Sequence, residues 1–178
     1  MSESTCPRFK IAGRRLAFLG VATTSAGYAF SVGQRDNTID RDKMMTHVTE
    51  IASATDLPVS ADLENGFGDS PETVAETIRL AAGTGLVGGS IEDMSKRPDH
   101  PIYELELAAE RIRAAAEVAR SLPFVFTLTA RAENYLVGRP DLKDTIGATS
   151  GLSGCRGRCP VCARSEEQRG RGFGGQFC

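Results

Sequence analysis

Short apolar runs alternate with amphipathic stretches between residues 16 and 130, and this alternation limits the fold more than any other feature of the sequence. The apolar runs have the length and composition of buried strands. The strands that we expect are Leu16–Val21, Val59–Leu63, Leu86–Glu92 and Phe124–Ala130. Amphipathic helices between apolar strands predict parallel βαβ units and a sheet covered on both faces. The fold class that follows is α/β.

The predicted helices begin at recognisable signals. Asp40 is a candidate N-cap for the first helix. Ser70, followed by Pro71, predicts the start of the second helix, because serine caps helices and proline suits the first helical position. The third helix is expected at Glu104–Ser121, where apolar residues repeat at helical spacing. The small residues 22–27 after the first strand predict a polar loop.

Polar side chains follow all four predicted strands at their carboxyl ends. They are Thr24 with Ser25, Asp62 with Glu64, Glu92 with Asp93, and Arg131 with Glu133. In a (β/α)8 barrel the carboxyl ends of the strands meet at one mouth. An open doubly wound sheet concentrates its site at one switch point instead. We therefore expect a partial TIM barrel with about four βα units.

Asp62 and Glu64 are the most specific chemical signal. The two acids are two residues apart, so their side chains share one face if the strand continues that far. A bound cation would relieve their mutual repulsion, and an oxygen-only ligand set suits Mg²⁺ or Mn²⁺. The alternative is a strand that ends in a polar turn.

The four strand ends together define a chemical hypothesis. Asp62, Glu64 and Glu92 would hold a divalent ion, directly or through water. The ion would chelate the carboxylate and keto oxygen of a substrate, and Arg131 would stabilise negative charge on that oxygen. Thr24–Ser25–Ala26 would anchor the substrate carboxylate. The plainer alternatives are an ion pair between Glu92 and Arg131 and a helix cap at Thr24–Ser25.

Four ordered motifs then carry a family resemblance. The segments ATTSAGYAFSVGQRD, SADLENGFGD, GGSIED and TARAEN resemble the isocitrate lyase and phosphoenolpyruvate mutase superfamily over residues 14–146. The resemblance implies Mg²⁺-dependent cleavage or formation of C–C or P–C bonds next to an α-keto acid, through an enolate-type intermediate. The implied substrate is a small α-keto acid or a phosphonate.

The resemblance also implies roles for individual residues. It makes Asp62, Glu64 and Glu92 the metal-site acids, Arg131 the substrate arginine, Thr24–Ser25–Ala26 the carboxylate-binding turn, and Asp36 a further catalytic residue. One departure concerns the lid loop, which has a cysteine motif in isocitrate and methylisocitrate lyases. The equivalent loop at 93–100 has no cysteine, which argues against an isocitrate-type substrate. Lys96 and His100 are the candidates for a lid role there.

Composition limits the other function classes. The chain has 178 residues, of which 40% are hydrophobic and 25% are charged, as in an ordinary soluble globular protein. The net charge of -2 gives no basic field for nucleic acid. No apolar run approaches the ~20 residues of a membrane helix, and we find no targeting segment. We expect a cytoplasmic protein without nucleic-acid or membrane partners.

The two ends of the chain differ from its centre. We expect an irregular segment at 1–13, the partial barrel at 14–146 and a disordered tail at 147–178 that is rich in Gly, Arg and Cys. The superfamily forms homo-oligomers through C-terminal helices, which we do not expect from this tail. Cys155, Cys159 and Cys162 suggest a zinc site, but a structural zinc site needs four ligands and within the tail only the distant Cys178 remains.

A frameshift is an alternative explanation of the tail. Codons can be chosen for residues 147–164 that encode GRLQAYQDAGADVLYAPG when read one base later. That sequence has the pattern of the next helix and strand of the superfamily. The chain would then be a non-catalytic, truncated form of such an enzyme, and resequencing the gene tests this hypothesis.

Overall fold

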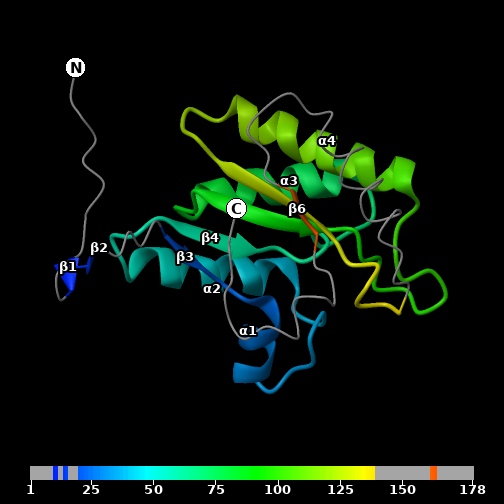
Figure 1. Ribbon diagram of the computed structural model, residues 1–178, viewed down its shortest axis with the longest axis horizontal. Coiled ribbons are helices and arrows are strands. Elements are labelled where there is room, and N and C mark those ends of the chain that lie inside the picture. Colours follow the sequence, from blue (N-terminus) through cyan, green and yellow to red (C-terminus); the bar gives the residue numbers. More distant parts are fainter. Residues whose placement is uncertain (1–9, 12–13, 16–19, 139–160, 164–178) are drawn as a thin grey trace.

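A parallel sheet in chain order forms the frame of the molecule (Figure 1). The computed structural model describes residues 10–11, 14–15, 20–138 and 161–163. Its elements are β1 (Lys10–Ile11), β2 (Arg14–Arg15), β3 (Val21–Ala22), α1 (Ser25–Ser31), α2 (Arg41–Ser53), β4 (Val59–Asp62), α3 (Pro71–Gly83), β5 (Gly88–Glu92), α4 (Leu105–Ser121), β6 (Thr127–Ala132) and β7 (Val161–Ala163).

The sheet has the strand order β3-β4-β5-β6-β7, and every neighbouring pair is parallel. Parallel neighbours require a crossover connection, and α2, α3 and α4 supply those between β3 and β6. Helices α3 and α4 pack against each other along the sheet (Figure 1). The predicted α/β class and the parallel βαβ units are therefore confirmed.

The expected helix starts are also confirmed. A side-chain oxygen of Asp40 accepts a hydrogen bond from the Lys43 backbone N–H at 2.9 Å, which caps α2. Ser70 Oγ accepts one from the Thr73 N–H at 3.2 Å, and Pro71 is the first residue of α3. Each such cap contributes about 1 kcal/mol to helix stability.

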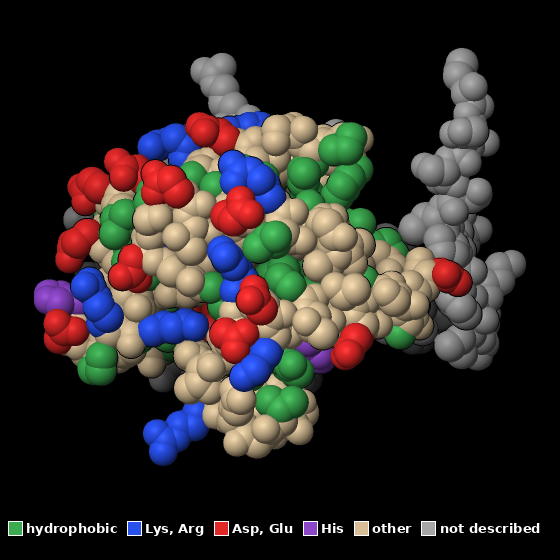
Figure 2. Space-filling view, turned by 180° about the vertical axis from the view of Figure 1, so that it is seen from behind, with side chains coloured by type: hydrophobic (Ala, Val, Ile, Leu, Met, Phe, Trp, Pro, Cys, Tyr) green, Lys and Arg blue, Asp and Glu red, His purple; other side chains and the backbone are tan. Residues whose placement is uncertain are grey.

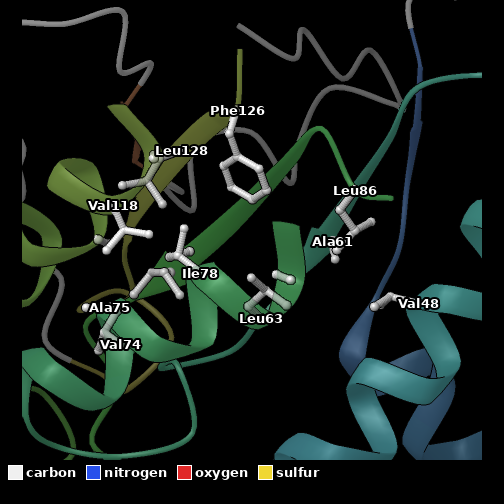
Figure 3. Packing of buried hydrophobic residues seen from close by; sticks show 14 of the residues in the cluster. Val48, Ala61, Leu63, Val74, Ala75, Ile78, Leu86, Val118, Phe126 and Leu128 are labelled. Atoms are coloured by element: carbon white, nitrogen blue, oxygen red, sulfur yellow. The ribbon is translucent and has the colours of Figure 1, made fainter. Parts of the chain in front are cut away.

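The core lies between the sheet and its helices. Val59 and Ala61 of β4 are buried, and so are Leu128 and Ala130 of β6, whereas the residues between them are more exposed. Figure 3 shows side chains from the strands and from α3 and α4 meeting in this layer; Phe126, Leu128, Ile78 and Val118 are labelled. Strand residues alternate between two faces. In the central strand β5, buried residues lie on both faces, in agreement with the predicted covered sheet, whereas β4 and β6 alternate between buried and more exposed residues.

Several predicted boundaries differ from the observed ones. The polar loop predicted at residues 22–27 is wrong over residues 25–27, which belong to the helix α1 (Ser25–Ser31). The fourth strand begins at Thr127 instead of Phe124, because Phe124 and Val125 are exposed before the chain enters the sheet. The first strand is Val21–Ala22, and residues 16–19 of the predicted strand lie outside the described residues.

The predictions for the two ends are only partly covered by the structure. Arg14–Arg15 pairs with Lys10–Ile11 in a short antiparallel sheet, although we expected no strand there. Within the tail, Val161–Ala163 forms β7 and pairs in parallel with β6. Cys162 is part of β7. The rest of the predicted irregular segment and of the predicted disordered tail, with the other candidate zinc cysteines, lies outside the described residues.

On the face shown in Figure 2, acidic and basic side chains are interspersed. In the part of the chain that the structure describes, no helix is long and apolar enough to cross a membrane.

Candidate active site

Arg131 is the centre of a cluster of carboxylates at the carboxyl ends of β4, β5 and β6. Its Nη1 lies 3.1 Å from Asp62 Oδ1. Its Nη2 lies 3.3 Å from Glu92 Oε2 and 2.5 Å from Glu133 Oε1. Strand register explains the meeting, since Glu92 and Arg131 are direct neighbours on β5 and β6. The alternative of an ion pair between Glu92 and Arg131 is thus correct, but the pair belongs to a larger cluster.

Asp62 is fixed by the start of α1. Its Oδ2 accepts hydrogen bonds from Ser25 Oγ at 2.8 Å and from the Ser25 N–H at 3.2 Å. Thr24 is the N-cap of α1, and Ala26 is the second residue of this helix. The cap alternative for Thr24 is therefore confirmed. In this structure the N–H and hydroxyl of Ser25 point at Asp62, so the predicted carboxylate-binding turn already holds a carboxylate of the protein.

Glu64 is buried at the beginning of the loop after β4, with a backbone φ of 50°. Its Oε2 forms an ion pair with Lys96 of the loop after β5. Its Oε1 is buried and has no hydrogen-bond partner among the described residues. Asp36 is exposed, and its carboxylate is close enough to Glu64 to raise the pKa of Glu64 by charge repulsion.

The electrostatics of the cluster favour a proton or a cation. Burial is the main cause that raises the pKa of Glu92 to about 8, and the neighbouring carboxylates of Glu133, Asp62 and Glu64 add to it although Arg131 opposes it. Burial also raises the pKa of Glu64, against the effect of Lys96. Both shifts have the same physical origin, because a buried carboxylate among like charges is costly in its ionised form.

The residues present fit a hard divalent ion. The site has four carboxylates, those of Asp62, Glu64, Glu92 and Glu133, but only two cationic side chains, Arg131 and Lys96. Among the described residues, Glu64 Oε1 has no hydrogen-bond partner and could bind an ion. Within the described residues, no three His, Cys, Asp or Glu side chains are arranged to hold an ion directly. Mg²⁺ commonly keeps several waters and takes one or two carboxylates, so the arrangement matches an ion held partly through water.

Three contributors were not among the predicted site residues. Glu133 was noted only as a strand-end acid, although it follows β6 directly and its i+2 spacing from Arg131 favours a position on the same side of the chain. Lys96 was considered only for a lid, yet it is the partner of Glu64. His100, the other lid candidate, is exposed and lies 3.8 Å from Asp99. Arg111 of α4 is also buried. Its position within the apolar stripe of this helix was the signal in the sequence that could have identified it.

Comparisons with known proteins identify the family of the chain. The sequence model of the phosphoenolpyruvate phosphomutase family matches residues 9–148. The 2-methylisocitrate lyase of Salmonella typhimurium is 33% identical over 133 residues, which are 71% of this chain and 43% of that protein. The Escherichia coli 2-methylisocitrate lyase is 31% identical over 121 residues, 64% of this chain and 40% of that protein. The chain thus spans less than half the length of these curated relatives.

Solved structures show the same partial coverage. A Burkholderia cenocepacia J2315 protein, named only as a lyase/mutase, is 59% identical with a TM-score of 0.79, over 83% of this chain and 53% of that one. A phosphonopyruvate hydrolase in complex with oxalate and Mg²⁺ is 18% identical with a TM-score of 0.74, over 85% of this chain and 52% of that one. The second likeness concerns the fold alone.

The fold is therefore shared with proteins about twice as long. The expectation of a partial (β/α)8 barrel is confirmed, and so is the superfamily resemblance. With the matched region running through all the strand ends described above, the chain belongs to the phosphoenolpyruvate phosphomutase family.

Proposed function

We propose that the protein is an Mg²⁺- or Mn²⁺-dependent lyase or phosphonomutase-type enzyme that acts on a small α-keto acid or phosphonate through an enolate-type intermediate. The observation that carries the proposal is the convergence of Asp62, Glu92 and Glu133 on Arg131 at the strand ends. A site of this kind can neutralise both a cation and an anionic substrate.

The residues would divide the work as follows. Asp62, Glu64 and Glu92 would hold the ion, which supplies Lewis-acid polarisation of a keto oxygen when it is bound. Arg131 would stabilise the negative charge that develops on this oxygen, because its guanidinium stays protonated beside three carboxylates. Asp36, which is exposed and close enough to Glu64 to raise the pKa of that residue, would act as a further catalytic residue.

Substrate binding would use the start of α1. Ser25 already donates its N–H and hydroxyl to a carboxylate, that of Asp62. We propose that Thr24–Ser25–Ala26 would hold the carboxylate of the substrate in the same way, in place of the Asp62 carboxylate, which would serve as a metal ligand. The structures of phosphonopyruvate hydrolase with oxalate and of oxaloacetate acetylhydrolase with oxalate support a small dicarboxylate-like ligand.

A second candidate is a non-catalytic chain that keeps the site residues in an incomplete barrel. The chain spans 40% and 43% of its curated relatives. A frameshift near codon 147 would account for such a chain, and the family match ends at residue 148.

Thermal unfolding with Mg²⁺ and oxalate distinguishes the two candidates. Oxalate imitates a planar enolate, and ligand at about 100 times Kd stabilises a protein by ~2.7 kcal/mol. We expect the two together to raise the Tm of the wild type more than either does alone, and Asp62→Asn to abolish the rise. Asp56→Asn removes an exposed acid at the other end of β4 and is the matched control. A wild type without a shift would refute the enzyme and support the non-catalytic chain.

A further inference from the structure

A buried arginine of α4 holds the loop that follows β4. We define the acid loop as residues 64–69, which begin with Glu64. Arg111 is 1% exposed, and its Nη1 donates to the carbonyl oxygens of Gly68 at 2.6 Å and Asp69 at 2.5 Å. Its Nη2 donates to the carbonyl oxygen of Asn65. One guanidinium thus binds three carbonyls of a single loop, and its planar set of donors suits this task.

Tyr103 supports the same loop from the side. The Arg111 guanidinium carbon lies 4.1 Å from the centroid of the Tyr103 ring. The Tyr103 hydroxyl donates to Asp69 Oδ1 at 2.6 Å and accepts from Asn65 Nδ2 at 3.0 Å. Burial, followed by the hydrogen bond to Asp69, raises the pKa of Tyr103 to about 12, so the phenol keeps its proton and remains a donor.

The acid loop needs such support because its backbone is strained. Glu64 and Phe67 have left-handed φ angles of 50° and 62°, a region that disfavours residues with a Cβ. Gly66 between them has a φ of 79°, and a Cβ at this position would come within 3.0 Å of Val74. Strained backbone of this kind persists only where surrounding contacts over-determine it.

We propose that Arg111 is a positioning residue that keeps Glu64 in its left-handed conformation and thereby keeps the Glu64 carboxylate inside the metal site. The proposal rests on the proposed function for the identity of that site. Arg111 binds three carbonyls of the loop and lies beside the Tyr103 ring, so it can act on the site through the backbone. Without it, the loop would relax and the carboxylate would leave its place beside Asp62 and Lys96.

Titration calorimetry of Mg²⁺ in the presence of oxalate tests the proposal, with Arg111→Lys and Arg111→Met as variants. Positioning residues behind metal ligands commonly contribute 10- to 100-fold to affinity. We expect Kd to rise about tenfold or more while the stoichiometry stays at the wild-type value. Arg113→Met removes an exposed arginine of the same helix and should leave Kd unchanged. A lower stoichiometry with an unchanged Kd would mean that Arg111 only supports folding, which overturns the proposal.

Amide hydrogen exchange without metal or oxalate tests the clamp independently of the proposed function. The Gly66 N–H is bonded to the Leu63 carbonyl and the Phe67 N–H to Asn65 Oδ1. We expect both amides to exchange faster in Arg111→Lys, and to a smaller extent in Tyr103→Phe, while Ile78 in α3 keeps its protection. Unchanged exchange rates in the acid loop, or an equal loss of amide protection in the acid loop and in α3, would overturn the positioning role. A wild type that does not bind Mg²⁺ and oxalate refutes the proposed function only, and the exchange result then decides on Arg111.

Discussion

Replacing Glu92 with glutamine should remove much of the pH dependence of stability that we expect for this chain in EDTA. Burial among other carboxylates raises the pKa of Glu92 from 4.5 to about 8 in the folded state. Between these two values the folded protein holds a proton that the unfolded chain has released. The free energy of unfolding therefore falls as pH rises through this window, and it is highest below the unfolded pKa.

The magnitude follows from the size of the shift. Each pH unit inside the window costs up to ~1.4 kcal/mol, so the step from about pH 5.5 to about pH 7.5 should cost the wild type ~2 kcal/mol. Glutamine has the shape of the protonated side chain and cannot ionise. The stability of Glu92→Gln should therefore approach and then exceed that of the wild type as pH rises.

Urea unfolding at a series of pH values measures the effect, with circular dichroism as the signal. The relevant quantity is the wild-type free energy of unfolding minus that of Glu92→Gln, because other titrating groups cancel in this difference. Glu110→Gln removes an exposed acid of α4 and is the matched control. A difference that stays flat between pH 5.5 and 7.5, or that grows in favour of the wild type, would refute the electrostatic description of the cluster.

Three further changes test separate parts of the structure. Ile78→Ala opens a cavity in the core and should lower the free energy of unfolding in urea by ~2–5 kcal/mol. Leu80→Ala, at an exposed position of the same helix, should lower it much less. Equal decreases in the two variants would contradict the described core. Ser25→Ala removes the hydroxyl that donates to Asp62 Oδ2 and should cost ~1.5–3 kcal/mol, as for hydrogen bonds to charged groups; a neutral effect would mean that this bond does not form in solution. Lys96→Met removes the cation beside Glu64, so Mg²⁺ should bind more tightly, by about tenfold at most. Titration calorimetry measures the affinity, and Arg97→Met, at an exposed arginine, is the control. An unchanged affinity in Lys96→Met would exclude competition between Lys96 and the ion.

Local patterns were sufficient to predict the three long helices and the parallel order of the strands. The caps at Asp40 and Ser70 are properties of single residues, and helical periodicity marks α4 without any knowledge of its partners. The helix α1 was missed because its seven residues are mostly small and have little amphipathic pattern. Its start is fixed by the cap at Thr24 and by the distant contact between Ser25 and Asp62.

The candidate site divides in the same way. The meeting of Asp62, Glu92 and Arg131 could be predicted, because the carboxyl ends of parallel strands share one edge of a sheet. The pairing of Glu64 with Lys96 could not, since it depends on left-handed backbone at both residues. The role of Arg111 depends on contacts across more than forty residues of chain, which no local pattern encodes.

The most direct test of the metal and enolate site is an anomalous difference map from crystals grown with Mn²⁺ and oxalate. The proposed site predicts a single strong peak beside the carboxylates of Asp62, Glu64 and Glu92, with oxalate density between the ion and Arg131. Crystals in which Mn²⁺ binds elsewhere, or in which this edge of the sheet holds neither ion nor oxalate, would contradict it.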